Sequence, residues 1–224
     1  MTISTTRTLA PGAFDTREMV IVHRVFRRES RLLAELVEAV EPGDARRAGV
    51  LAEHFADYAF GLHTHHHGED DLLWPPLASR VQLADALVDR MRAQHERVAA
   101  TLAAAEAGVA AWVRHPGADE RDALVAVLVE HRSVLVEHLD QEEREVLPLA
   151  AKYLTAVEWA RMGEHFVAST PKPKVLMYLG SILEDTTPDE RALMLGVLPR
   201  PARLVWALVG RRRYARHIAR VRRG

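Results

Sequence analysis

Apolar residues recur at steps of three and four along four long stretches of the chain, which is the spacing of helices with one buried face. The spacing predicts helices over residues 15–40, 44–73, 79–112 and 119–149. Proline and glycine pairs such as Pro42-Gly43 and Pro116-Gly117 end two of them. Because no alternation of period two persists, the pattern indicates an all-α protein.

Helices of this length joined by short turns pack most simply as an up-down-up-down four-helix bundle. We expect the bundle to occupy residues 14–152. Beyond it the apolar pattern shortens, with helix-start signals at Thr155 and Pro188 and a Pro/Lys-rich linker over residues 169–174. Residues 153–224 are therefore predicted to form a helical appendage that ends in an Arg-rich helix.

Composition limits the chemistry that the chain can carry. With 224 residues, of which 48% are hydrophobic, it can bury a sizeable core. It has no cysteine, which excludes disulfides, thiolate nucleophiles and cysteine-bound metal sites. Any active site must use His, Asp, Glu, Tyr or backbone groups. Since the N-terminal region lacks the apolar run of a secretory signal, we expect a cytoplasmic protein.

The net charge of −1 hides an uneven distribution. Residues 200–224 hold nine arginines and no acid, while residues 1–199 carry a net charge of −10. An acidic body disfavours nucleic acid as a partner. The basic end leaves open a peripheral membrane or an acidic partner. We favour the simpler interpretation, in which residues 204–209 dock on the bundle and the arginines complement its charge.

Five of the twelve histidines lie between residues 54 and 67. They form three competing i, i+4 pairs with each other or with acids, at positions 63/67, 65/69 and 66/70. Steps of four and three along the apolar face lead from Leu62 to His65 and then Glu69, so this pair is predicted to point inward. His66 falls beside that face, and His54, His63 and His67 are expected at the surface.

The same H-x-x-x-E spacing recurs later in the chain. The sequence around His65 and Glu69 aligns without gaps with that around His138 and Glu142. The two remaining long helices place single histidines in phase with their apolar faces. Six residues on four helices are therefore predicted to meet in one interior layer: His23, His65, Glu69, His95, His138 and Glu142.

Burying four imidazoles and two carboxylates without partners costs several kcal/mol per group, and coordination of a cation removes that cost. Imidazole and carboxylate ligands in a bundle interior suit a pair of iron ions, with manganese or zinc as substitutes. Tyr58 and His131 lie one heptad before the two H-x-x-x-E pairs. They are predicted either to support the ligands or to close a hydrogen-bonded layer, and Glu143 is a neighbour that can replace Glu142.

The sequence resembles the hemerythrin-like HHE cation-binding family over residues 15–152. The most specific matches are the H-x-x-x-E-[ED]-x-x-[LV]-[WL]-P blocks at His65 and His138. His23 and His95 correspond to single family histidines. The resemblance implies a non-haem di-iron centre, bridged by oxo or carboxylate groups, that reacts with dioxygen, nitric oxide or peroxide.

The sequence departs from oxygen-carrying hemerythrins, which have a second histidine one turn along the third long helix, because Met91 and Ala99 flank His95 at one turn. Its set of four histidines and two glutamates is more similar to that of iron-sensing and peroxide-reactive relatives. Two functions are therefore expected: a di-iron protein that binds or consumes dioxygen, peroxide or nitric oxide, with catalase-like or oxygen-reducing activity left open, or an iron sensor or store that signals through its C-terminal extension.

Overall fold

The computed structural model describes residues 14–81 and 84–223, and every regular element in these ranges is helical, which confirms the all-α prediction. The elements are α1 (Arg17–Glu38), α2 (Ala45–Leu72), α3 (Trp74–Arg80), α4 (Ala84–Arg114), α5 (Ala118–Gln141), the π-helical turn η1 (Glu142–Val146), α6 (Leu147–Tyr153), α7 (Ala156–Ser169), α8 (Lys172–Leu183), α9 (Pro188–Gly196), α10 (Arg200–Val205), the π-helical turn η2 (Trp206–Gly210) and α11 (Arg211–Arg222).

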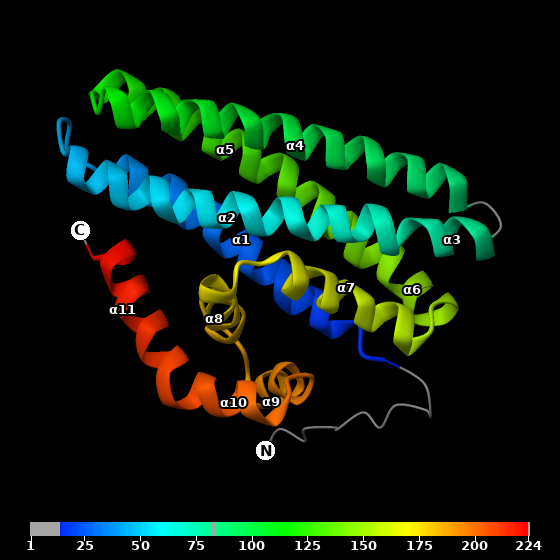
Figure 1. Cartoon of the computed structure of the whole chain (residues 1–224). Helices are drawn as coiled ribbons and strands as arrows, with labels where there is room; N and C mark the ends of the chain where they lie inside the picture. Colours follow the sequence, from blue (N-terminus) through cyan, green and yellow to red (C-terminus); the bar gives the residue numbers. More distant parts are fainter. Residues whose placement is uncertain (1–13, 82–83, 224) are drawn as a thin grey trace, which may run out of the picture.

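The four long helices form a helical bundle (Figure 1). Helix α1 packs against α2 and α5, and α4 packs against the same two helices. Their apolar faces make two separate clusters. One cluster contains Phe26 and Leu62, and the other contains Met19 and Met91. Between the clusters each long helix buries at least one polar side chain, such as His23 on α1 and His138 on α5, so a polar layer crosses the bundle interior between two apolar regions.

Several helix boundaries differ from the prediction. Helix α2 ends at Leu72, and Pro75 and Pro76 lie in the first turn of the short α3, where a missing backbone N–H removes no helical hydrogen bond. The long helix expected from residue 79 is described from Ala84. Helix α8 starts at Lys172, inside the expected linker.

The helix expected over residues 119–149 contains a π-helical turn. It runs as α5, then η1 over Glu142–Val146, then α6. Single π-helical turns within α-helices are rare, and many of them lie at functional sites. Here the turn starts where the chain carries Glu142 and Glu143, and both carboxylates lie within 3.4 Å of His23 on α1.

The C-terminal helices pack mainly on the side of the bundle formed by α1 and α2 (Figure 1). Helix α7 lies on α2, α8 and α9 lie on α1, and α11 contacts α8 and α2. The expected helix-start signals are present as capping boxes at Thr155 and Thr187. No helix within the described ranges combines the length and apolarity needed to cross a bilayer.

This packing overturns the prediction that His54 lies at the surface. His54 is buried where the C-terminal helices cover α2, and its Nε2 lies 2.9 Å from Glu29 Oε2. Burial opposes ionisation of Glu29, yet the bond from His54 and the charge of Arg28 lower its pKa to about 2. His67 is exposed and His63 is half-exposed, so the prediction of a surface position is confirmed for His67 and partly for His63.

The predicted docking of residues 204–209 is wrong for most of that segment. Only Trp206 is buried, and the five residues around it are exposed. The arginines near the end of α11 do meet acidic groups of the body, because Arg220 pairs with Glu53 and Arg222 pairs with Glu184.

Candidate metal centre

The structure brings all six predicted ligand residues together in the polar layer. His23 comes from α1, His65 and Glu69 from α2, His95 from α4, His138 from α5, and Glu142 from the first position of η1. All six side chains are less than 10% exposed. The layer therefore lies in the dry interior, where an unpaired charge or dipole is costly.

The imidazole Nε2 atoms face two carboxylates. His65 Nε2 and His95 Nε2 lie 3.1 Å and 3.3 Å from the two oxygens of Glu69. His23 Nε2 and His138 Nε2 lie 3.4 Å and 3.7 Å from one oxygen of Glu142. Each carboxylate therefore lies close to imidazole nitrogens from two helices.

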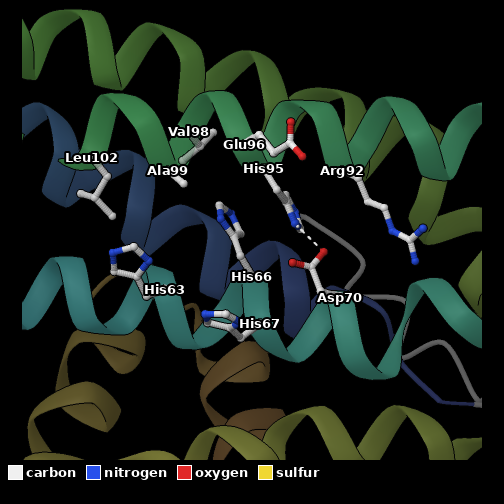
Figure 2. A pocket seen from close by; sticks show the side chains of 10 residues that line it. All are labelled: His63, His66, His67, Asp70, Arg92, His95, Glu96, Val98, Ala99 and Leu102. Carbon is white, nitrogen blue, oxygen red and sulfur yellow. Dashed lines mark hydrogen bonds and ion pairs between the residues drawn. The ribbon is translucent and has the colours of Figure 1, made fainter. Parts of the chain in front are cut away.

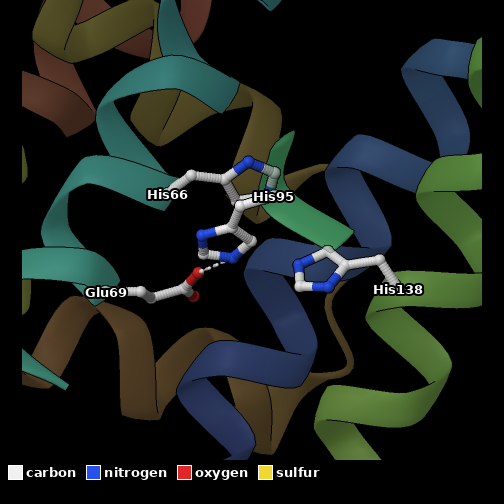
Figure 3. Close-up of side chains that lie close together, drawn as sticks. All are labelled: His66, Glu69, His95 and His138. Atoms are coloured by element: carbon white, nitrogen blue, oxygen red, sulfur yellow. Dashed lines mark ion pairs between the residues drawn. The ribbon is translucent and has the colours of Figure 1, made fainter. Parts of the chain in front are cut away.

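His66 joins this cluster, although its helical phase predicted a position beside the inward face. It is 8% exposed, and its ring stacks on His95 with 4.2 Å between centroids (Figure 3). The inner side of α2 faces both α1 and α4, so two successive residues, about 100° apart around the helix, can both point inward. The sequence carried two signals for this residue, the unbroken histidine run from 65 to 67 and the i, i+4 spacing of His66 and Asp70.

Two groups of potential ligand atoms result, each with its atoms within 4.8 Å of one another. They share the carboxylate of Glu69. One group contains His66, Glu69, His95 and His138, and the other contains His23, His65, Glu69 and Glu142.

The donor atoms of this cluster lack hydrogen-bond partners. The Nε2 atoms of all five histidines and all four carboxylate oxygens of Glu69 and Glu142 are buried without a partner. Buried polar groups in folded proteins nearly always have a hydrogen-bond partner. Nine buried nitrogen and oxygen atoms without such a partner in one place are therefore what a cation site requires. The residues present therefore fit the metal that the resemblance implies.

Three of the histidines are held from behind through Nδ1. His23 Nδ1 donates to Glu143 at 2.9 Å, and His95 Nδ1 donates to Asp70 at 2.9 Å (Figure 2). His138 Nδ1 lies 3.2 Å from the amide oxygen of Gln94. Such bonds orient the ring and leave Nε2 free for a metal. Glu143 therefore lies behind His23, and the spacing of Asp70 and Gln94 along the chain gave no signal for their contacts with His95 and His138.

Tyr58 and His131 form a hydrogen-bonded layer instead of contacting these donors. Tyr58 Oη lies 2.7 Å from His131 Nε2, and His131 Nδ1 lies 3.0 Å from Thr101 Oγ1. Thr101 donates its own proton to the carbonyl of Val98, so it accepts from His131, and Tyr58 donates to His131. Of the two alternatives left open for this pair, the structure shows the layer across the bundle.

The two carboxylates differ in ionisation. Burial, together with the charge of Glu69, raises the pKa of Glu142 well above its ordinary value. Burial acts on Glu69 in the same direction, but His65 and His95 lower its pKa to about 2. Two buried carboxylates this close do not both ionise readily without added positive charge. A bound cation supplies that charge.

The neighbouring imidazoles also differ in their pKa values. Burial lowers the pKa of His65 to about 4 and that of His138 to about 3, so both rings are neutral near pH 7. Burial also opposes the charge on His95, yet its hydrogen bond to Asp70 and the negative charge of Glu69 raise its pKa to about 9. Neutral imidazole is the form that binds metals.

The family model of the hemerythrin HHE cation binding domain matches residues 15–150. The chain belongs to the hemerythrin HHE cation-binding family. The match spans α1 to α6 and includes all of the residues in the two donor groups of this hemerythrin domain. The chain matched no curated protein and no solved structure.

Proposed function

We propose that residues 14–152 form an up-down-up-down hemerythrin bundle that holds two iron ions and binds or reacts with dioxygen, peroxide or nitric oxide at them. Residues 153–224 form a separate helical extension. The observation that carries the proposal is the set of nine buried, unbonded donor atoms in two groups that share Glu69.

The donor set suits iron. Mixed imidazole and carboxylate ligands suit iron and manganese, and a carboxylate common to two groups suits a pair of ions. Each group offers four residues, which is fewer than the six positions that iron commonly uses, so positions remain for a small molecule. Bound iron supplies the electron transfer that dioxygen, peroxide or nitric oxide chemistry requires.

The chain's own residues give small molecules a route to the centre. A cleft of about 310 Å³ lies between α2 and α4, and its wall includes His66 and His95 (Figure 2). Ala99 lies in the same wall, one turn after His95. Its short side chain leaves space that a histidine would fill. The cleft therefore reaches the donor group that contains His66.

A metal titration tests the proposal. Metal-free protein titrated anaerobically with Fe²⁺ is expected to bind two ions per chain. Glu69→Ala should abolish both strong sites because both groups use this carboxylate, whereas His23→Ala and His66→Ala should each leave one. His67→Ala is the matched control, since His67 is exposed on the same helix.

Binding of one ion by the wild type, or two strong sites in Glu69→Ala, would contradict the shared centre. The cleft is tested separately with azide, a small anion that binds ferric iron. Ala99→Phe should slow azide binding severalfold while the metal stoichiometry stays at two. An unchanged rate would show that small ligands enter elsewhere.

The second function, an iron sensor, is favoured by contacts between α1 and the extension. Arg24, next to His23, donates to the carbonyl of Asp185 and to Glu190 of α9. Metal bound at His23 therefore orders a helix that also holds the extension. Hydrogen exchange in α9 that slows severalfold on iron binding, without turnover of peroxide, would support the sensor. Turnover with unchanged exchange would support the first function.

A further inference from the structure

An exposed aliphatic patch lies on α10 and η2. Leu204 and Leu208 are each 59% exposed, and Val205 and Val209 are each 47% exposed. Single exposed apolar residues are common on soluble proteins, but neighbouring ones in a patch indicate a binding surface. Within the described ranges, no leucine outside this segment is among the strongly exposed large hydrophobic residues.

The patch is turned away from the rest of the protein. The inward side of the same segment is already occupied: Trp206 packs over Gly210, and Tyr214 of α11 packs on Gly180 of α8. Figure 1 shows α10 and α11 at the edge of the molecule, remote from α4 and α5. The segment therefore already packs on its own chain through its aromatic side chains, and its aliphatic side chains remain uncovered.

Six arginines surround the aliphatic residues and are exposed: Arg200, Arg203, Arg211, Arg212, Arg213 and Arg216. None of the six has an ion-pair partner among the residues that the structure describes. In contrast, Arg220 and Arg222 pair with acids of the body. The arginines that anchor the helix are thus distinct from those around the patch, whose charge is not neutralised.

We propose that this C-terminal patch, the four aliphatic residues and the six arginines of residues 200–216, binds an anionic membrane surface. Such a surface offers both complements at once, because phosphate headgroups accept guanidinium hydrogen bonds and the acyl region receives short aliphatic side chains. The mean negative charge of the leaflet attracts the arginines. This proposal does not depend on the metal centre.

Two other occupants fit less well. A two-fold contact with a second copy would place the same arginines opposite one another, which is repulsive. A nucleic acid would bind the arginines but would leave the leucines in water. A membrane surface is the partner that uses both halves of the patch.

Flotation with lipid vesicles tests the proposal on the full chain. The protein should float with vesicles of phosphatidylcholine and phosphatidylserine, and much less with phosphatidylcholine alone. Leu204→Ser with Leu208→Ser should weaken binding roughly tenfold, and Arg212→Ser with Arg216→Ser by about fivefold per arginine. Circular dichroism establishes that each variant is folded.

Matched controls lie elsewhere on the chain. Val157→Ser with Val167→Ser removes equally exposed aliphatic groups from α7, and Arg132→Ser with Arg161→Ser removes exposed arginines from α5 and α7. Both control pairs should bind as the wild type does. The proposal is overturned by binding that ignores phosphatidylserine, by leucine variants that bind normally, by a dimer that the leucine changes dissociate, or by preferential binding of duplex DNA.

Discussion

Glu142→Met should stabilise the metal-free protein although it removes a proposed metal ligand. Glu142 is fully buried, neither of its oxygens has a hydrogen-bond partner, and its pKa is raised by burial. An unsatisfied buried polar group destabilises a fold by about 1–3 kcal/mol. Methionine has a similar volume and no such group, so the free energy of unfolding should rise by about that amount. For a chain of this size the melting temperature should rise by roughly 2–12 °C.

Glu143→Met is the matched control, because it makes the same change one residue further along η1. Glu143 accepts bonds from His23 at 2.9 Å and from Arg27 at 2.6 Å. Its loss leaves the buried Nδ1 of His23 unsatisfied, so this variant should be less stable than the wild type by about 1–3 kcal/mol. Thermal melts in excess chelator compare the three proteins.

Adding iron should reverse the order of the melting temperatures of the wild type and Glu142→Met. Iron that binds only the folded state stabilises the wild type by mass action, and Glu142→Met should lose much of that gain. The reasoning is refuted if Glu142→Met melts below the wild type in chelator, or if iron raises the melting temperature of both proteins equally. Either result would mean that Glu142 stabilises the fold rather than a bound cation.

Three further outcomes follow from other contacts. Tyr58→Phe removes the donor to His131 and should lower the free energy of unfolding by about 1–3 kcal/mol, measured by urea unfolding of chelated protein. Glu29 has a pKa lowered from 4.5 to about 2, so its contribution of roughly 3 kcal/mol is present above pH 4.5 and lost as pH falls toward 2; Glu29→Gln should flatten that part of the stability curve. Gly180→Ala adds a carbon against the ring of Tyr214 and should speed hydrogen exchange in α11 but not in α5.

The helical period identified the parts of the centre that depend on spacing within one helix. His65 and Glu69 share a face because four residues nearly complete a turn, and the repeated H-x-x-x-E pair identified His138 and Glu142 in the same way. The single histidines at 23 and 95 followed from their phase with apolar neighbours. All six side chains meet in the structure.

The features that the sequence pattern did not predict depend on which helices pack against one another. His66 points inward because α4 lies beside α2, and His54 is buried because the C-terminal helices cover it. The π-helical turn at Glu142 leaves no mark in the apolar pattern. The exposure of Leu204 and Leu208 depends on which side of η2 receives Trp206, which hydrophobicity alone does not specify.

Anomalous diffraction from crystals of the iron-loaded chain would locate the bound metal. We expect two iron peaks on either side of Glu69, one among His66, His95 and His138 and the other among His23, His65 and Glu142. A single peak, or peaks outside the layer between the two apolar clusters, would contradict this arrangement.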